Sequence, residues 1–364
     1  MIRSAGGEQQ RPMERPWVSI VIASYNSARL LPETLKAVDA QVPPRGAQGP
    51  VEVLVIDGGS NDGTIEIAEQ FGARTIENPF GDPIHAKHIG FLSASSRCVC
   101  FLDHDEILLS ASSLARKVDL IHGDHGIRVV ASSGYEIQED PSACNAYASE
   151  FGDPLSLFMY RTPNVSDRRP ATFRRRLRAA QIDDAWVGSE LRRPGLLLEV
   201  AAGGTVVDAD FFLSRFPAIH DDPSLVPHLF YLLLEKGGGG GAILENDPIL
   251  HRTASSWTQV FTKVAWRIQN GIASTSTLGR SGLSGRPADK HIPLALFLPY
   301  TLLIFPAAVD AVYLAVSRRR FGYLMHFPLS LYVTLSGAYA FLKAKLSGGR
   351  HQRSRYDGTP LNGD

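Results

Sequence analysis

The sequence predicts an α/β fold in which strands and helices alternate along the first 140 residues, followed by a pair of apolar helices near the C-terminus. Short β-favouring runs at 17–23, 51–56 and 98–102 are separated by amphipathic segments, which favours a mostly parallel sheet with right-handed crossovers. A cluster of carboxylates follows the last of these runs, in residues 103–106. Open α/β sheets bind ligands at the carboxyl ends of their strands, so the acids indicate a binding site there.

The remaining elements follow from the periodicity of apolar residues. The segment 27–40 is predicted to be a helix because Leu30, Leu31, Leu35 and Val38 have helical spacing. Further strands are expected at 74–76, 127–137 and 242–250, and further helices at 64–71, 83–94 and 222–236, the last stopped by the glycines 237–241. Residues 150–204 give a poorer signal and hold an Arg-rich block (Arg168, Arg169, Arg174, Arg175, Arg176, Arg178). This block is interpreted either as a site for phospholipid headgroups or an acceptor phosphate, or as a solvated helix face.

Composition limits the classes of protein. The chain has 364 residues, 44% of them hydrophobic, which is enough for a large core. Basic and acidic residues balance at 37 each, so no global field indicates nucleic acid as a partner. Three cysteines (Cys98, Cys100, Cys144) provide neither a disulfide framework nor a CxxC zinc clamp, and reduced thiols in a cytosolic domain are expected. Residues 1–16 are polar, which predicts a disordered lead rather than a signal peptide.

The C-terminal third has a different character. Residues 292–316 and 322–342 are nearly uncharged, and each run is long enough to cross roughly 30 Å of hydrocarbon. Two such runs in tandem favour membrane-associated helices over buried helices of a soluble domain. However, a two-pass hairpin would place the arginines 318–320 outside, against the positive-inside tendency, and Pro299, Pro306, Asp310 and Pro328 lie within the runs. Kinked, interfacial and re-entrant helices therefore stay open as alternatives to simple spans.

Four segments, taken in order, carry a resemblance to a known family. They are Val18 to Asn26 (VSIVIASYN), Val55 to Thr64 (VIDGGSNDGT), Ala86 to Gly90 (AKHIG) and Phe101 to Asp105 (FLDHD). With them, residues 17 to about 270 resemble a family 2 glycosyltransferase with the GT-A fold. The resemblance implies a GT-A domain at 17–272, with a nucleotide-binding half at 17–137 and an acceptor half at 138–272. A linker at 273–291, membrane helices at 292–346 and a polar basic tail at 347–364 would complete the chain.

The resemblance implies a nucleotide-diphosphate sugar as donor. The turn Ala23 to Asn26 would place the Tyr25 ring beside the nucleobase, although Tyr25 is also explained by simple packing. Asp57 would accept from a base N–H, whereas an Asx turn or a helix cap better fits Ser60 and Asp62. Lys87 would lie near the base or phosphates, with an exposed surface lysine as the alternative. The implied nucleotide-sugar-binding residues are Ala23, Tyr25, Asn26, Asp57, Lys87 and Asp103.

A divalent cation, Mg²⁺ or Mn²⁺, is the expected cofactor. Asp103 and Asp105 are one residue apart, and two such carboxylates can hold a cation whose shell is completed by nucleotide phosphates. The resemblance implies that Asp103 contacts the ribose or the metal and that Asp105 binds the metal, which acts as a Lewis acid. His251 matches a family histidine near the metal or diphosphate, or is a plain surface histidine. Glu106 could add a ligand, but a solvated side chain explains it better.

The second half is expected to supply a general base. Asp222 is the preferred candidate and Asp221 the second, because the family commonly has an acidic pair that opens a helix there. The alternative is a helix N-cap, since Pro223 follows Asp222. The chain also departs from the family pattern. Ser27 stands where some relatives carry an acid, Lys87-His88 replaces an Arg-Asn pair, and the Gln-x-x-Arg-Trp motif of processive synthases is absent, which favours transfer of one sugar.

The sequence therefore predicts an inverting, membrane-associated glycosyltransferase that acts at the cytoplasmic face of the cell membrane. A polyprenyl phosphate or a lipid-linked glycan is the expected acceptor, membrane lipids are expected partners, and a homo-oligomer is compatible with the sequence. Two other classes of function stay open as alternatives. One is another nucleotide-using transferase, although the Gly-rich phosphate loop expected near its first strand is not found in this sequence. The other is a non-catalytic membrane scaffold that retains the fold.

Overall fold

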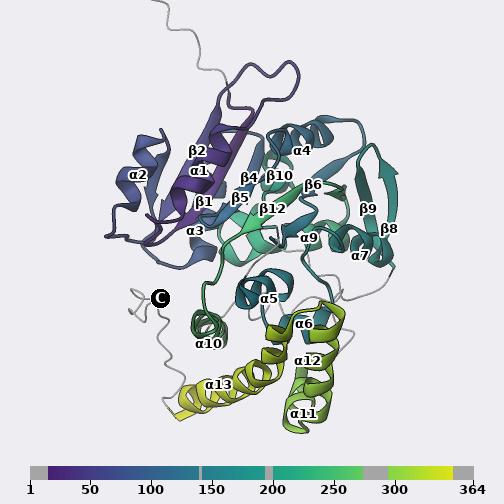
Figure 1. The fold of residues 1–364 in the computed structure, drawn as a ribbon. Coiled ribbons are helices and arrows are strands. Elements are labelled where there is room, and N and C mark those ends of the chain that lie inside the picture. Colours follow the sequence, from purple (N-terminus) through teal and green to yellow (C-terminus); the bar gives the residue numbers. More distant parts are fainter. Residues whose placement is uncertain (1–14, 139–141, 193–199, 274–293, 347–364) are drawn as a thin grey trace, which may run out of the picture.

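The computed structural model describes residues 15–138, 142–192, 200–273 and 294–346. A nine-stranded sheet forms its centre, with the strand order β3-β2-β1-β4-β10-β6-β11-β9-β8 (Figure 1). All of these strands except β10 and β9 run in the same direction, so the predicted mostly parallel α/β sheet is confirmed. The strands are β1 (Val18–Ser24), β2 (Val51–Asp57), β3 (Arg74–Glu77), β4 (Cys98–Asp103), β6 (Ile127–Ala131), β8 (Leu177–Ile182), β9 (Ala185–Leu191), β10 (Thr205–Asp208) and β11 (Gly240–Leu244).

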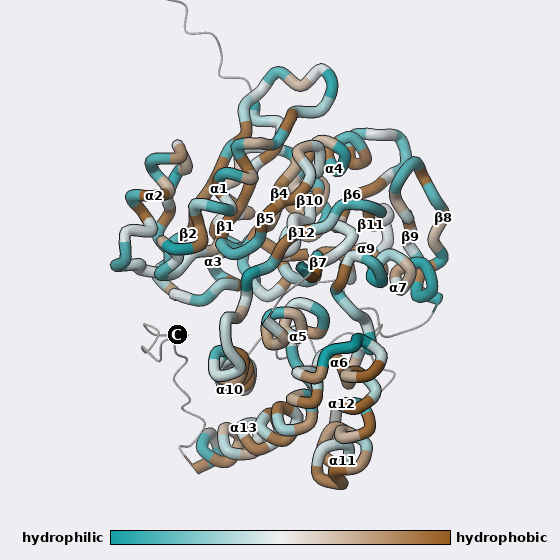
Figure 2. The backbone as a smooth tube through the Cα atoms, in the orientation of Figure 1, coloured by the Kyte–Doolittle hydropathy of each residue, from teal (hydrophilic) through white to brown (hydrophobic). Residues whose placement is uncertain are grey.

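Helices cover both faces of this sheet because its central strands are apolar on both sides. One face packs against α1 (Leu31–Asp39), α2 (Thr64–Gln70) and α4 (Ser113–His122). The other packs against α3 (Pro83–Ser93), α7 (Arg169–Arg176), α8 (Ala209–Arg215) and α9 (Leu229–Lys236). Each Leu or Ile fully buried in these layers contributes about 1.5–3 kcal/mol of transfer free energy. Figure 2 shows apolar (brown) runs along the central strands and alternating polar and apolar residues along the helices.

Gly90, the last residue of the segment Ala86 to Gly90, has a clear physical reason to be glycine. A Cβ atom at this position of α3 would lie 2.2 Å from Cγ1 of Val21 in β1. Only a residue without a side chain allows the helix to approach the strand so closely. The helix that carries Lys87 is therefore held directly against the end of the sheet that carries the predicted site.

The register of the parallel strands brings three predicted site segments to one edge. Ser24 of β1 is paired with Asp57 of β2, and Ala23 of β1 is paired with Asp103 of β4. Because these strands are parallel neighbours, their carboxyl ends lie together. The turn after β1, the end of β2 and the acidic cluster after β4 thus form one continuous rim.

A second sheet of three strands closes the acidic end. It has the order β5-β12-β7, with β5 (Glu106–Leu108), β12 (Pro248–His251) and β7 (Gly134–Glu136). The prediction of a single strand at 127–137 is wrong. β6 ends at Ala131 and pairs in the large sheet, whereas β7 pairs with β12 in this smaller sheet. The strand expected at 242–250 is likewise divided between β11 and β12.

The helix expected at 222–236 is also divided. Pro223–His228 forms the 3₁₀ segment η2, and α9 begins only at Leu229. Pro227 lies inside this segment and has no N–H to donate, so a continuous α-helix through it is disfavoured. The preceding turn, η1 (Pro217–His220), leads into the two candidate bases.

The C-terminal helices form a separate layer below the sheet in the view of Figure 1. They comprise η5 (Leu294–Leu296), α11 (Phe297–Leu302), α12 (Phe305–Ser317), η6 (Phe321–Met325) and α13 (His326–Leu346). These pack with α5 (Ala143–Phe151), α6 (Pro154–Tyr160) and α10 (Trp257–Ala273) around an apolar cluster of their own. The layer is therefore attached to the acceptor half.

The predicted pair of membrane-spanning helices is not supported. Among the described residues, every helix is too short or too polar to cross a bilayer. The first apolar run is interrupted at Leu303 and Ile304, where Ile304 adopts a positive φ of 63° that is rare for a β-branched residue. The kinked arrangement that the sequence left open therefore describes this run.

A buried polar network holds the C-terminal layer in place. The Tyr147 hydroxyl donates to Nδ1 of His326 over 2.6 Å, and Nε2 of His326 lies 2.7 Å from the Tyr300 oxygen. The Tyr300 hydroxyl donates in turn to Asp310, which is paired with Arg161 at 2.7 Å. This set of donors and acceptors fits a neutral imidazole, and burial lowers the pKa of His326 to about 4.

Some predicted segments lie outside the described residues. These are almost all of the N-terminal lead at 1–16 and of the linker at 273–291, together with the tail at 347–364. The three cysteines are buried and free, as the predicted reduced thiols require.

Candidate active site

The rim of the sheet is organised by an ion pair between α3 and β4. Nζ of Lys87 lies 2.7 Å from Oδ1 of Asp103 and donates to the Leu102 carbonyl over 2.5 Å. The Lys87 side chain is buried, whereas Asp103 is about one-third exposed. The exposed-lysine alternative is therefore wrong, and the Lys87 ammonium supplies a fixed positive charge beside an accessible carboxylate.

Asp105 points toward a different group of cations. Its Oδ1 lies 3.7 Å from Nε2 of His251, and its side chain is only 7% exposed. Burial would raise the pKa of the Asp105 carboxyl, but positive charge from His251, His104 and Lys263 outweighs it and the pKa lies below the ordinary value. Asp105 is thus held as a carboxylate inside the protein.

His251 is fixed by stacking and by its strand. Its ring lies against Tyr135 with centroids 4.4 Å apart and an interplanar angle of 26°. Residue 251 ends β12, where it is paired with Glu106 of β5, and its carbonyl accepts from Asn145 over 2.9 Å. The side chain is 14% exposed, so the plain surface-histidine alternative is wrong.

Glu106 is buried, and the expectation that it is solvated is wrong. Its carboxylate accepts from the backbone N–H of Asp103 over 2.9 Å and of Gly203 over 2.8 Å, and from the Tyr135 hydroxyl over 2.6 Å. Burial and then the charge of Asp103 raise the pKa of Glu106 above its ordinary value. Glu106 therefore shapes the acidic turn and positions the ring on which His251 rests.

The part of the rim formed by the ends of β1 and β2 is a tightly hydrogen-bonded turn. Asp57 is buried and accepts from the N–H groups of Gly59 and Ser60, each over 2.8 Å. Asn26 has a positive φ of 47° and accepts from the Asn61 N–H over 3.0 Å. The sequence favoured Ser60 and Asp62 for an Asx turn or a helix cap, but the Asp57 carboxylate itself accepts two of the backbone hydrogen bonds of this turn.

Two further features make this end suited to a ligand. Ser24 Oγ is buried and has no hydrogen-bond partner among the described residues. The Tyr25 side chain is half-buried and lies over Gly58, where a Cβ would be 3.6 Å from the ring. An unused hydroxyl beside a ring at the carboxyl end of a central strand is a suitable environment for a base.

The candidate base segment is attached to α3. Nε2 of His88 donates to the Ile219 carbonyl over 2.6 Å, two residues before Asp221. Burial lowers the pKa of His88, although the charge of Asp222 opposes this. One helix therefore positions both ends of the site, through Lys87 at the acidic turn and His88 at the base segment.

Asp222 also acts as a helix cap. Its Oδ1 accepts from the N–H of Ser224 over 3.0 Å and from the Ser224 hydroxyl over 2.6 Å, at the start of η2. Asp222 is half-buried and Asp221 is exposed. The capping role that the sequence offered as the alternative is thus observed.

The donor set partly suits a divalent cation. Within the described ranges, no group of three or more His, Cys, Asp or Glu side chains is arranged to hold a metal ion. Nε2 of His251 lies 3.7 Å from Oδ1 of Asp105, and the other ring nitrogen, Nδ1, is buried without a hydrogen-bond partner there. A carboxylate and an imidazole are a partial set of ligands, which the oxygens of a diphosphate would complete. Asp105 and His251 thus fit part of such a site, whereas Asp103 is paired with Lys87.

The Arg-rich block has several separate partners. The Arg174 guanidinium lies 4.9 Å above the Trp186 ring, and Arg178 faces Glu190 at 3.4 Å. Arg169 donates to the Ser132 carbonyl over 3.3 Å, and burial lowers its pKa. Arg174 and Arg169 thus have partners within the fold, whereas Arg178 lies in an exposed ion pair.

Sequence reasoning missed three residues at the site. The Tyr135 ring stacks on His251, Asn145 donates to the carbonyl of His251, and the charge of Asp105 acts on the half-buried Lys263 of α10. The run Ser132-Ser133-Gly134 before Tyr135 was an available signal, because small turn-forming residues after an apolar strand mark a break. Asn145 and Lys263 had no comparable local signal.

Comparison with known proteins gives a consistent result. Residues 19–147 match the model of glycosyl transferase family 2. Glycosyltransferase AglE of Haloferax volcanii is 38% identical over 96 residues, which is 25% of this chain and 31% of that protein. The PGL/p-HBAD biosynthesis glycosyltransferase Rv2957 of Mycobacterium tuberculosis is 32% identical over 127 residues, or 31% of this chain and 48% of that protein. The chain thus spans less than half the length of these curated relatives.

The fold extends the likeness beyond the matched segment. A mannosyltransferase from Pyrobaculum calidifontis, solved in complex with GDP-Man and Mn²⁺, superposes with a TM-score of 0.52 over 92% of this chain and 91% of that one, at 14% identity. Such a likeness concerns the fold alone. Residues 19–147 therefore resemble glycosyl transferase family 2 in sequence, and the described chain has the fold of a solved mannosyltransferase.

Proposed function

We propose that this protein is an inverting glycosyltransferase that moves one sugar from a nucleotide-diphosphate sugar to an acceptor hydroxyl or phosphate. The observation that carries the proposal is the common rim formed by the ends of β1, β2 and β4, where Ser24 is paired with Asp57 and Ala23 with Asp103. Residues 19–147, which match the family, contain this whole rim. A solved mannosyltransferase of similar fold binds GDP-Man and Mn²⁺, which supports a nucleotide-sugar and a divalent cation here.

In this proposal, one group of rim residues binds the nucleobase of the sugar donor and a second group binds its diphosphate through a cation. Ala23, Tyr25, Asn26 and Asp57 lie at the nucleobase end, and Asp103, Asp105 and His251 would hold Mg²⁺ or Mn²⁺ beside the diphosphate. A bound cation neutralises charge on the departing nucleoside diphosphate. Lys87 adds a fixed positive charge next to Asp103. The preorganised charges favour departure of the diphosphate because they act where negative charge develops.

Asp222 takes the acceptor proton in this proposal. Where the acceptor is a hydroxyl, its oxygen attacks the anomeric carbon while the bond from that carbon to the diphosphate breaks, and the Asp222 carboxylate receives the hydroxyl proton. A phosphate acceptor attacks through an oxygen that is already deprotonated, so it needs no base. A single displacement of this kind inverts the anomeric configuration. Asp221, which is exposed and adjacent, is the second candidate for the base.

A polyprenyl phosphate or a lipid-linked glycan is the acceptor we favour. The reason is the helical layer attached to the acceptor half, which exposes large apolar side chains at the surface. Catalysis at the cytoplasmic face of the cell membrane would bring such an acceptor to the site.

The test is release of nucleoside diphosphate from a panel that includes GDP-mannose and UDP-glucose, with the full chain and with Mn²⁺, Mg²⁺ or EDTA. The proposal expects metal-dependent release from at least one donor, lost in Asp105→Ala. An intact protein that neither binds nor cleaves any donor would instead favour a non-catalytic scaffold. Transfer of a nucleotidyl group would favour another nucleotide-using transferase.

A further inference from the structure

Exposed apolar side chains are concentrated in one part of the molecule. Of the 23 large hydrophobic residues that are exposed in the described ranges, 17 lie between residues 294 and 346. The other six are scattered singly over the sheet domain, which is normal for a soluble surface. The C-terminal layer therefore carries an apolar surface that the rest of the fold does not cover.

Helix α12 is the clearest part of this surface. Its inner side packs Ala307, Ala311, Leu314 and Ala315 against the protein, so small residues dominate the buried side. The larger side chains point outward, and Phe305 is 76% exposed and Val316 is 70% exposed. A helix that is apolar on both sides is normally covered by other protein or by lipid.

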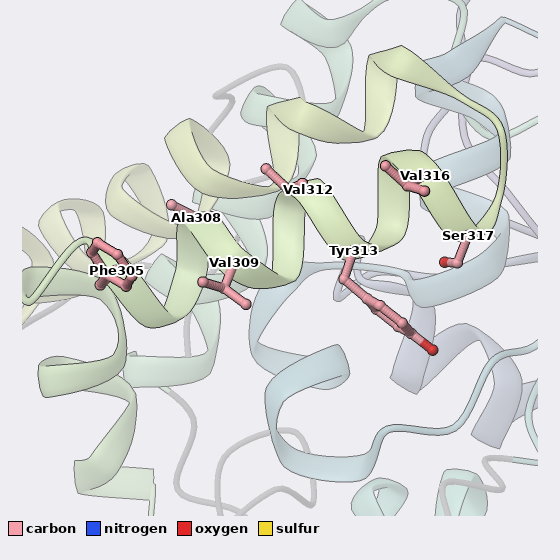
Figure 3. A pocket seen from close by; sticks show the side chains of 7 residues that line it. All are labelled: Phe305, Ala308, Val309, Val312, Tyr313, Val316 and Ser317. Carbon is pink, nitrogen blue, oxygen red and sulfur yellow. The ribbon is translucent and has the colours of Figure 1, made fainter.

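The outward side is hollowed into an open, entirely apolar groove of about 550 Å³ (Figure 3). Its lining residues are Phe305, Ala308, Val309, Val312, Tyr313, Val316 and Ser317. We use the term apolar face for the exposed side chains of residues 302–316 together with Phe321. The face begins at the corner 302–305, where four consecutive apolar residues are exposed.

Charge at the edge of the apolar face is mainly positive. Arg318, Arg319 and Arg320 follow α12 directly; Arg318 is paired with Glu150 at 2.7 Å, whereas Arg319 is exposed. Asp310 is the one carboxylate between residues 294 and 346 of the sequence, and it is already paired with Arg161 and Tyr300. The surface thus combines large apolar side chains with a cationic border.

We propose that the apolar face docks on an anionic lipid bilayer and that α12 lies in the interface without spanning it. Interfacial helices insert an apolar side about 5–10 Å deep and attract anionic headgroups through basic residues. At 13 residues, α12 is about 20 Å long, which suits a position parallel to the surface. Tyr313 is 61% exposed on this face and adds the amphipathic ring that membrane interfaces favour.

The cationic border favours a bilayer over a second copy of the chain. A two-fold dimer would bring the same surface of a second copy against the apolar face, and the one carboxylate in residues 294–346, Asp310, is already paired with Arg161, so it offers these arginines no opposite charge. Anionic headgroups complement the same charges. The docking does not depend on the glycosyltransferase proposal, because it concerns a surface remote in sequence from the catalytic residues.

The experiment is flotation of the full chain with vesicles of phosphatidylcholine alone or mixed with phosphatidylglycerol. Binding to the mixed vesicles is expected, with a smaller bound fraction on pure phosphatidylcholine and at high salt. The triple variant Phe305→Ser, Val312→Ser, Val316→Ser should bind at least tenfold more weakly, because three inserted side chains are lost. Its exposed positions leave the core intact, and an unchanged circular dichroism melting curve would verify this.

Matched control variants distinguish binding through the apolar face from non-specific binding through other exposed apolar residues. The triple variant Val42→Ser, Phe71→Ser, Leu109→Ser removes exposed apolar residues elsewhere and should bind like the unmodified chain. Arg319→Glu should weaken binding to the anionic vesicles about threefold or more, whereas Arg45→Glu should not. A full chain that fails to float with anionic vesicles would overturn the proposal, as would equal binding by the two triple variants. A dimer that only the first triple variant dissociates, without vesicle binding by the unmodified chain, would assign the face to a second copy.

Discussion

The His251 ring is stacked on the Tyr135 ring, and the same imidazole places Nε2 3.7 Å from Oδ1 of Asp105. Tyr135 is in turn anchored by its hydroxyl, which donates to the buried Glu106. A chain of contacts therefore runs from the core to the acidic turn. The position of His251 therefore depends on Tyr135 and Glu106 as well as on its own strand.

Tyr135 should control the metal dependence of the enzyme. Tyr135→Ala removes both the stacking partner of His251 and the hydrogen bond to Glu106, whereas Tyr135→Phe removes only the hydrogen bond. We expect the Mn²⁺ concentration for half-maximal activity to rise about tenfold or more in Tyr135→Ala and less in Tyr135→Phe, as for other residues that orient metal ligands. Activity measured against Mn²⁺ concentration checks this, and an unchanged half-maximal concentration in Tyr135→Ala would contradict it.

Glu106 should be important for stability. Glu106→Ala leaves the N–H groups of Asp103 and Gly203 and the Tyr135 hydroxyl without their acceptor inside the protein. The free energy of unfolding should fall by about 3 kcal/mol, since each buried donor left unpaired costs about 1–3 kcal/mol. Urea unfolding measures the change. The exposed Glu69→Ala is the control, and equal stability of the two variants would show that Glu106 does not hold the turn.

Asp222 and Asp221 can be separated by amide substitution. Asp222→Asn keeps an oxygen that can cap η2, so stability should change little, while the amide cannot accept the acceptor proton. The turnover number should fall about 10²- to 10⁴-fold with little change in donor KM. Asp221→Asn should retain activity. The reverse pattern, with activity lost only in Asp221→Asn, would move the base to Asp221.

Acid should loosen the attachment of the C-terminal layer. The folded pKa of His326, about 4, lies below the ordinary value of about 6.5, so protonation favours the unfolded state. Neutral His326 therefore contributes its full share to the free energy of unfolding above pH 6.5, and this share is lost as the pH falls toward 4. The free energy of unfolding should fall by about 3 kcal/mol over this range.

A substitution isolates this contribution. His326→Gln should flatten the decline of unfolding free energy between pH 6.5 and 4, and the exposed His125→Gln should not. Denaturant unfolding at a series of pH values provides the measurement. An equally steep decline in His326→Gln and in the unmodified chain would exclude His326 as a source of the pH dependence.

Much of the fold was predictable because its signals are local. The apolar runs of β1, β2 and β4 each read as a strand, and parallel pairing then brought Asp57 and Asp103 to one rim. The free buried cysteines also followed from their number and spacing. These inferences needed only short-range patterns and the rule that parallel strands end together.

The misses came from long-range contacts. Glu106 was expected in solvent, but its partner Gly203 is 97 residues away and could not be foreseen. The strand expected at 127–137 breaks because β7 pairs with β12, more than 100 residues later. Apolar length suggested two spans at the C-terminus, but the kink at Ile304 and the packing of α13 on α10 depend on tertiary structure. The predicted cellular location is still a prediction.

The most direct measurement is the thermal unfolding of the full chain with nucleotide-sugars, with and without Mn²⁺, for the unmodified protein and for Asp105→Ala. A donor at 100 times its Kd stabilises the folded state by about 2.7 kcal/mol, so the unmodified chain should melt about 3–4 °C higher with donor and Mn²⁺. In Asp105→Ala the Mn²⁺-dependent part of that shift should vanish, while Glu69→Ala should keep it. A metal-dependent shift of equal size in Asp105→Ala would contradict a cation site at the acidic turn.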